Sequence, residues 1–177
     1  MNITEKMETL VENSIEKKHP FLSEKDIQEV EREIGVQFDK RLRQFLTEYA
    51  DCYFKDDYMF TSIDRIPLGH EDGYVNPGYF YGKNILSKYE DYKLILGAGF
   101  IPICDLDGGD LLCTKINRSE TGEIYYWSHD DTNDEDDSQF FFVAESFEEF
   151  IKSFKYNKRD LDIDLSKVKI TLDPSLM

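Results

Sequence analysis

Three aspartates surround a pair of glycines in the segment CDLDGGDLLCTKI, residues 104–116. An EF-hand calcium loop needs acidic ligands at its first, third and fifth positions and a bidentate glutamate at its twelfth. Counted from Asp105, the fifth position is Gly109 and the twelfth is Ile116, so this template fails. A phosphate-binding loop would open a helix, whereas the next residues, LLCTKI, are typical of a strand. The segment is therefore predicted to be a β-hairpin turn, with a weak ion site as the alternative.

A dense acidic run follows in HDDTNDEDDSQ, residues 129–139, between two aromatic stretches. Six acids within eight residues strain a folded state through self-repulsion. Three interpretations are open: a solvated loop, a loop that meets basic residues of a partner, and a calcium or magnesium site without a recognisable ligand template. We predict partner-binding residues in this run at Asp130, Asp131, Asp134, Glu135, Asp136 and Asp137.

The aromatic residues directly before this run are Tyr125, Tyr126 and Trp127. Alternation along a strand places Tyr125 and Trp127 on one face and Tyr126 on the other. Core packing is one interpretation of Trp127, and an anchor beside a charged interface is the other. We add Tyr125 and Trp127 to the predicted partner-binding residues. His129 beside Asp130 could form a catalytic or metal pair, but the sequence shows no second histidine or cysteine near it.

The three cysteines, Cys52, Cys104 and Cys113, are odd in number and lack CxxC spacing. They are expected to be buried, reduced thiols, because the three histidines show no arrangement that would supply a base. Acidic residues are too abundant for any pair of them to indicate acid–base catalysis. We therefore predict no catalytic residue, no metal, no cofactor and no enzymatic activity.

The chain as a whole is acidic, with 37 aspartates and glutamates against 21 lysines and arginines and a net charge of −16. A field of this sign repels nucleic acid and anionic membranes and attracts basic partners, although an acidic surface kept for solubility is the alternative. No stretch approaches the roughly 18 apolar residues of a membrane span. The first 20 residues lack the apolar run of a signal peptide, so we expect a cytoplasmic protein.

Helical spacing of apolar residues predicts an amphipathic helix over 4–18 and a second helix from the cap Ser23 to Gly35. The further helices are predicted over 39–49, 84–94 and 146–154. Strands are predicted over 100–105, 110–116, 123–128 and 139–144, with a weaker one near 58–66. Short connections between consecutive strands imply an antiparallel meander, so the fold class is α+β, with a single antiparallel sheet of about four to six strands flanked by helices.

Four stretches in this order resemble the SUKH superfamily, in its Smi/Knr-type branch: LSEKDIQEVEREIGVQFDKRLRQFLTEY, IPICDLDGGDLLCTKI, GEIYYWSHD and VAESFEEFIKSF. The resemblance runs from about Leu22 to Phe154. Two details differ from the usual family pattern: Asp39 stands where a proline is common, and residues 50–52 replace an Asn-Gly-Gly turn.

The resemblance implies an α+β fold and no shared catalytic constellation. Many bacterial members look like immunity proteins, which bind and neutralise a cognate toxin, often a nuclease, of contact-dependent or polymorphic toxin systems. We therefore expect an immunity protein whose partner is a basic toxin domain. A regulatory protein-interaction scaffold is the alternative, and an uncharacterised small-ligand or metal-binding domain is the third hypothesis.

Residues 1–154 are assigned to the SUKH-like domain, including its N-terminal helix, and residues 155–177 to a C-terminal extension of one or two added strands. Apolar residues alternate along 161–165 and again along 168–172 with the opposite parity, which implies a bulge or turn near Ser166.

We predict that this extension pairs with a sheet edge, either in the same chain or in a second copy, which would make a homodimer. Hydrogen exchange should then show protected amides around 168–172. Fast exchange throughout this segment would contradict the prediction.

Overall fold

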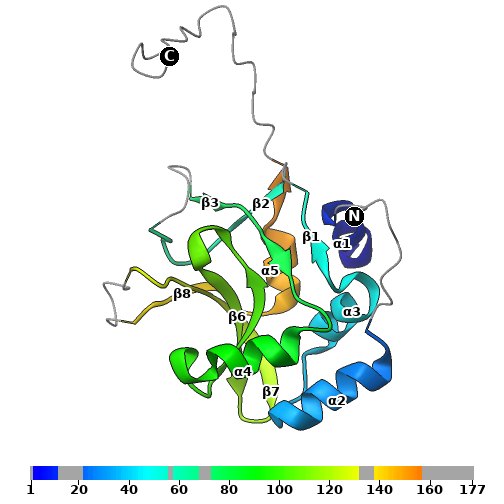
Figure 1. Cartoon of the computed structure of the whole chain (residues 1–177). Coiled ribbons are helices and arrows are strands. Elements are labelled where there is room, and N and C mark those ends of the chain that lie inside the picture. Colours follow the sequence, from blue (N-terminus) through cyan, green and yellow to red (C-terminus); the bar gives the residue numbers. More distant parts are fainter. Residues whose placement is uncertain (1, 12–21, 56–57, 68–72, 132–137, 157–177) are drawn as a thin grey trace, which may run out of the picture.

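Helices in the computed structural model lie around a central sheet (Figure 1). The structure describes residues 2–11, 22–55, 58–67, 73–131 and 138–156. The α-helices within these ranges are α1 (Ile3–Leu10), α2 (Glu24–Ile34), α3 (Lys40–Tyr49), α4 (Ile85–Leu96) and α5 (Phe147–Ser153). One short 3-10 helix, η1 (Asp107–Gly109), forms a turn between two strands.

The main sheet has six strands in the order β1-β4-β5-β6-β7-β8, and each neighbouring pair is antiparallel. Its strands are β1 (Cys52–Tyr53), β4 (Tyr79–Phe80), β5 (Phe100–Asp105), β6 (Leu111–Asn117), β7 (Glu120–Trp127) and β8 (Phe140–Ala144). A second, small sheet has the order β3-β2-β9, with β2 (Tyr58–Thr61), β3 (Tyr74–Val75) and β9 (Lys155–Tyr156). The predicted α+β class is confirmed, and the small sheet is an addition to the single sheet that was predicted.

Local capping explains why α2, α3 and α5 begin where the sequence predicts. Ser23 Oγ accepts a hydrogen bond from the Asp26 amide at 3.2 Å, and the Asp26 carboxylate accepts one from the Ser23 amide at 2.8 Å. Asp39 caps α3 and Ser146 caps α5 in the same way, through backbone amides of the first turn. Gly35 ends α2 in the left-handed conformation, with φ of 83°, which a glycine adopts without strain.

Helix α1 is shorter than the predicted helix over 4–18. It ends at Leu10, and Val11 is extended and forms a β-bridge with Phe54. The Leu10 carbonyl accepts a hydrogen bond from the Lys55 amide at 2.9 Å. The last helical amide bond is that of Val11 to the Met7 carbonyl, and the Leu10 carbonyl is satisfied by the chain that follows β1. Residues 12–18 of the predicted helix extend into a part of the chain outside the described residues.

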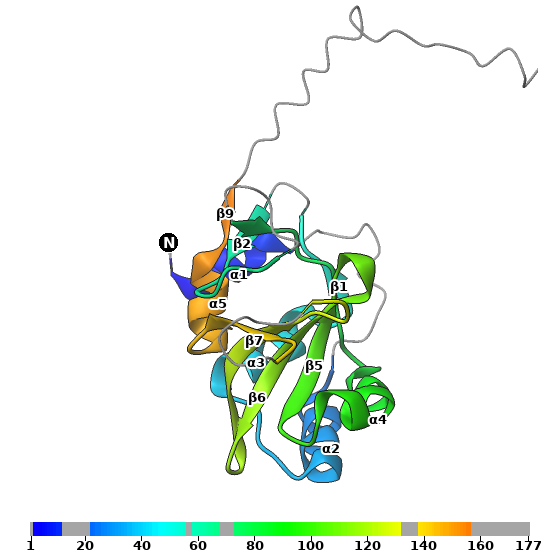
Figure 2. The same ribbon diagram turned by 90° about the vertical axis from the view of Figure 1, so that its left-hand side faces the viewer.

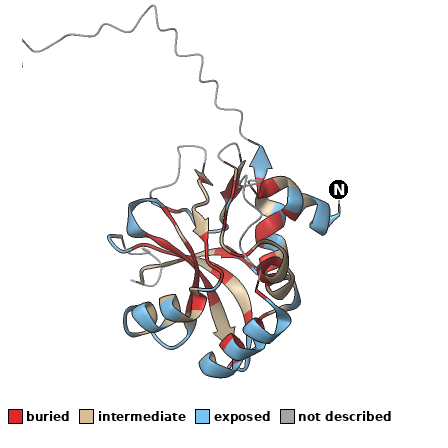
Figure 3. Cartoon of the chain, turned by 45° about the vertical axis from the view of Figure 1, so that its right-hand side comes forward, coloured by how far each residue is buried: buried red, intermediate tan, exposed pale blue. Residues whose placement is uncertain are grey.

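The main core lies between one face of the sheet, here called the inner face, and the helices α1, α2, α3 and α5 (Figures 1 and 3). Aromatic side chains dominate this contact: the Phe45 ring centroid lies 4.7 Å from that of Phe80 and 5.3 Å from that of Phe147. The rings meet edge to face, the arrangement that aromatic quadrupoles favour. This layer holds the inner face of the sheet rigid.

Helix α4 packs alongside β5 and close to α2 (Figure 2). It occupies the space next to β5 that the two-residue strand β4 leaves open. Its first turns add Ile85 to the main core, whereas its last turn places Leu96 against a second, smaller apolar cluster on the opposite face of the sheet. We call that opposite face the outer face.

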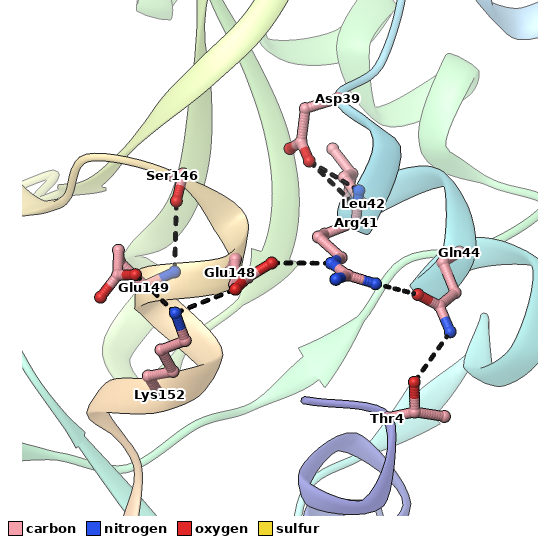
Figure 4. Close-up of polar contacts among 9 residues, drawn as sticks. All are labelled: Thr4, Asp39, Arg41, Leu42, Gln44, Ser146, Glu148, Glu149 and Lys152. Atoms are coloured by element: carbon pink, nitrogen blue, oxygen red, sulfur yellow. Dashed lines mark hydrogen bonds and ion pairs between the residues drawn. The ribbon is translucent and has the colours of Figure 1, made fainter. Parts of the chain in front are cut away.

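A chain of polar contacts joins α1, α3 and α5 at the surface (Figure 4). Arg41 Nε lies 2.7 Å from a carboxylate oxygen of Glu148, and its Nη1 donates to Gln44 at 3.0 Å. Lys152 also pairs with Glu148 at 2.9 Å. The hydrogen bond from Lys152 and, after it, the one from Arg41 lower the pKa of Glu148. Exposed pairs contribute little stability each, so this network orients the three helices more than it stabilises them.

Both outer strands of the main sheet have partners within the chain. Next to β8, the Asp64 amide donates to the Phe142 carbonyl at 2.8 Å, and the Phe142 amide donates to the Asp64 carboxylate at 2.6 Å. Next to β1, Val11 pairs with Phe54. A second copy that paired at either place would have to displace these contacts. The first two residues of the predicted extension, 155 and 156, form β9, which pairs with β2. The rest of the extension, residues 157–177, lies outside the described residues.

A buried carboxylate joins α2 to α3. Glu31 is 8% exposed, pairs with Arg43 Nη1 at 2.5 Å, and accepts a hydrogen bond from the Phe38 amide at 2.8 Å. Removal of the Glu31 carboxylate leaves the Phe38 amide without its acceptor and takes from Arg43 one of two carboxylate partners, the other being Glu24.

We expect Glu31→Ala to lower the free energy of unfolding by about 3 kcal/mol. Glu29→Ala is the matched control: Glu29 lies on the same helix, is exposed and pairs only loosely with Arg32 at 3.8 Å, so its loss should cost no more than about 0.5 kcal/mol. Urea unfolding of the three proteins measures both values. Equal midpoints for the two variants would contradict the role given to Glu31.

Candidate partner-binding surface

Strand β7 sends its aromatic residues to the two faces of the sheet as alternation predicts. Tyr126 is 3% exposed and belongs to the main core on the inner face. Trp127 points to the outer face but is 5% exposed, packed with Leu96, Leu111 and Cys113. The prediction that Trp127 anchors a partner at the surface is therefore wrong, because the end of α4 covers this side chain. Core packing was the other interpretation of Trp127, and the structure supports it.

Tyr125 lies on the outer face beyond α4 and is partly exposed. Its ring centroid is 5.3 Å from that of Phe100 and 5.3 Å from that of Phe142, and Phe140 stacks on Phe100 at 3.9 Å. All four rings are partly exposed. We call this group, Phe100, Tyr125, Phe140 and Phe142, the outer aromatic face. Tyr125 stays a predicted partner-binding residue, now with three neighbours that the prediction did not include.

A lysine of the chain already lies over this face. Lys115 Nζ is 5.3 Å from the centroid of the Tyr125 ring and 3.1 Å from the Glu123 carboxylate. The hydrogen bond that Lys115 donates to Glu123 raises the pKa of Lys115, and partial burial raises the pKa of Tyr125. The face therefore holds a cation at the hydroxyl edge of an aromatic ring, with a carboxylate beside it.

The third aspartate of the glycine-centred turn, Asp110, points into the protein and is fully buried. Its carboxylate accepts hydrogen bonds from the Tyr126 hydroxyl and from the His129 amide, the latter at 3.0 Å, and lies 2.8 Å from His129 Nδ1. Burial, and then the bond to Asp110, raises the pKa of Tyr126. Asp110 thus ties the turn to the first residue of the acidic run.

His129 contacts Asp130, its neighbour in the sequence, and also a second carboxylate. Its Nε2 lies 3.1 Å from Asp130, while Nδ1 faces Asp110. Alternation could have indicated that Asp110 points inward, because Asp110 has the same parity as the buried Leu112 in β6 and both side chains are directed to the core.

The start of the acidic run is held in place by these contacts. Ser128 is fully buried, and its Oγ accepts hydrogen bonds from the amides of Asp130 and Asp131 at 3.4 and 3.1 Å. The Asp130 side chain is 72% exposed. The other four predicted partner-binding acids lie outside the described residues: Asp134, Glu135, Asp136 and Asp137.

The turn at 104–116 is a β-hairpin, as predicted. Asp105 pairs with Leu111 across β5 and β6, and the Leu106 amide donates to the Asp110 carbonyl at 2.9 Å. Its aspartates face different partners. Asp105 accepts a hydrogen bond from the Tyr81 hydroxyl and lies 3.5 Å from Lys88, and neither of these residues contacts Asp110. Within the described ranges, no three acidic, histidine or cysteine side chains converge as a metal site would require.

All three cysteines are buried and free, as predicted. Burial raises the pKa of Cys52 to about 12 and also raises the pKa values of Cys104 and Cys113. A thiol is a nucleophile only as its thiolate, so these side chains are packing residues at neutral pH.

The fold is that of an α+β domain in which helices surround one main antiparallel sheet, and its surface offers an aromatic face beside a run of acids. The chain belongs to the SUKH family: the SUKH_6 family model, described as SMI1-KNR4 cell-wall, matches residues 24–151. The matched range begins at α2 and ends within α5, which agrees with the predicted extent of the resemblance.

A relative occurs in Bacillus subtilis (strain 168), the SPbeta prophage-derived uncharacterized protein YokK. It is 30% identical over 142 residues, which cover 72% of this chain and 71% of that protein. Family membership indicates a role in protein–protein interaction. In the described part of the chain, no helix combines the length and apolar character that crossing a bilayer requires.

The His129–Asp110 contact generates a pH prediction. The hydrogen bond to Asp110 raises the pKa of His129 above its ordinary value, and the charges of Asp130 and Asp131 act in the same direction. Because the folded pKa lies above the unfolded one, the stabilisation is complete below the unfolded pKa, about 6.5, and is lost as pH rises through the folded pKa.

An NMR titration should place the pKa of His129 above 6.5, and Asp110→Asn should lower it more than Asp130→Asn does. Should Asp110→Asn fail to fold, the difference in unfolding free energy between wild type and His129→Gln serves instead. This difference should be largest below about pH 6.5 and shrink at higher pH. A difference that grows with pH would contradict the assignment.

Proposed function

We propose that this chain is an immunity protein that binds and neutralises a cognate toxin with a basic domain, such as a nuclease, in a bacterial polymorphic or contact-dependent toxin system. The observation that carries the proposal is a net charge of −16 on a SUKH domain. An acidic protein of this kind is complementary to a toxin that binds nucleic acid, because such a toxin must itself be basic.

The relative YokK is named as prophage-derived, which supports the proposal. Toxin and immunity genes are of use to genetic elements that compete between bacterial cells, and a prophage is such an element. The chain would act inside the cell that makes it, where the toxin has its target.

The geometry supports inhibition by binding without catalysis. The buried thiols are held in the neutral form, and both ring nitrogens of His129 face carboxylates. By contrast, the surface offers aromatic rings, a cation–ring contact and the ordered start of the acidic run. We infer that neutralisation is steric and electrostatic: the chain covers the toxin and fills its basic site.

A regulatory scaffold is the second candidate. The description of the matching family model, SMI1-KNR4 cell-wall, favours it, because that description refers to the cell wall and names no toxin. The two functions differ in partner: a scaffold would bind several signalling proteins, whereas an immunity protein binds one toxin tightly.

The proposal is tested with the reading frames that neighbour this gene. Each is expressed in bacteria with and without this chain, and growth is measured. We expect one neighbour to arrest growth alone and to be harmless when this chain is present. If no neighbour is toxic, or if toxicity persists in the presence of this chain, the immunity proposal is wrong.

Association kinetics test the acidic run. Neutralisation of its six acids to Asn or Gln should slow association with the toxin by roughly ten- to a thousand-fold at low salt and flatten its salt dependence. The matched control neutralises six exposed acids elsewhere and changes the net charge equally: Glu8, Glu29, Glu33, Glu90, Asp91 and Glu120. It should slow association less. Identical on-rates for wild type and the run variant at low and high salt would exclude steering by this run.

A further inference from the structure

The two faces of the main sheet are covered unequally. On the inner face, α1, α2, α3 and α5 enclose the main core. On the outer face, the described chain contributes only the end of α4, which packs through Tyr92 and Leu96 over Trp127. Beyond α4 the strands β7 and β8 still carry aromatic residues on this face, and Tyr125 and Phe142 are partly exposed there.

These exposed rings are ordered by their mutual packing. The Tyr125 ring meets Phe100 nearly at a right angle, 82°, and tilts against Phe142 by 48°. Two χ angles fix each such side chain, so these rings would lose little side-chain entropy when a partner docks on the face. Clusters of exposed aromatic side chains in a preformed arrangement are typical of binding surfaces.

The chain itself shows which chemistry the face accepts. Lys115 holds its ammonium beside the Tyr125 ring, 3.4 Å from the Tyr125 hydroxyl and 5.3 Å from the ring centroid, and 3.1 Å from the Glu123 carboxylate. Glu123 precedes Tyr125 by two residues, about 7 Å along the strand, and shares its face. The acidic run begins just beyond the other end of β7. The rings therefore lie between two sources of negative charge.

We infer that the outer aromatic face is the docking surface for the protein partner and that the partner presents arginine side chains to it. A guanidinium group displaces the Lys115 ammonium from the Glu123 carboxylate, pairs with that carboxylate and stacks on the faces of Tyr125 and Phe142. Arginine suits this surface better than lysine, because its planar group stacks on rings and forks onto a carboxylate at the same time.

Charge decides between the possible occupants. A nucleic acid or an anionic membrane would be repelled by a chain of net charge −16, and so would a second copy of the same chain. A basic protein surface is attracted. The inference rests on the proposed function to the extent that this basic protein is the toxin, and it adds the surface and the side chains that the toxin would use.

The first experiment uses the toxin identified by growth rescue. Tyr125→Ala should weaken binding roughly ten- to thirty-fold, mainly through a faster off-rate. Tyr125→Leu keeps an apolar side chain against Phe142 but removes the ring, and should recover only part of the affinity. The matched control is Tyr156→Ala, since Tyr156 is a more exposed tyrosine, in the small sheet, that also packs on another ring, that of Tyr58. It should change the affinity less than about two-fold.

Thermal unfolding by circular dichroism confirms that each variant is folded. The Glu123→Gln variant, changed at a side chain outside the core, should also bind the toxin more weakly. Equal binding of toxin by Tyr125→Ala and Tyr156→Ala would overturn the surface assignment and leave the proposed function intact.

A second experiment needs no toxin. The NMR spectrum of the free protein is recorded with an octa-arginine peptide and with an octa-lysine peptide. We expect ring signals of Tyr125 and Phe142 to shift more with the arginine peptide. Shifts confined to the amides of Asp130 and Asp131 would overturn the inference. Because this readout does not depend on a toxin, it decides the surface even if no neighbouring gene proves toxic.

Discussion

The fully buried carboxylate of Asp110 constrains the functional end of the molecule. Removal of a carboxylate from water costs several kcal/mol unless hydrogen-bond donors replace the water. The donors come from a hydroxyl in β7 and from His129 after its end. Because these groups must converge on one side chain, the hairpin of β5 and β6 cannot move relative to the end of β7. The first residues of the acidic run therefore leave the sheet from a defined point.

Local signals in the sequence were sufficient for the helices that carry their own caps. Ser23 with Asp26, and Gly35 after Ile34, mark both ends of α2 without reference to the rest of the chain. The helix α1 was predicted too long because its end depends on the chain near Phe54, more than forty residues away. Of the small sheet, the weaker strand predicted near 58–66 corresponds to β2, whereas β3 and β9 have two residues each, too few for alternation to indicate them.

The candidate surface was predictable only in part, for the same reason. Alternation correctly separated Tyr125 from Tyr126, because it is a property of one strand. Whether Trp127 is exposed depends on the path of α4, which no pattern within β7 records. The contact between Asp110 and His129 spans 19 residues and two strands, so it depends on the register of β6 against β7, which the predicted meander does not fix. The contact between Phe100 in β5 and Tyr125 in β7 depends in the same way on how these strands align with β6 between them.

The short segment that runs beside β8 has a consequence for the behaviour of the protein in a crowded cell. The sequence FFFVA of this strand is apolar, uncharged and rich in residues that favour strands, which is the composition of segments that nucleate aggregates. An outermost strand of this kind invites the addition of further strands from other molecules. Here the Asp64 backbone and carboxylate occupy both hydrogen-bonding groups of Phe142, and the carboxylate places a negative charge at that point. Asp64 thus hinders the addition of a further strand at Phe142, and it does so with one residue contributed from nearly eighty residues earlier in the chain.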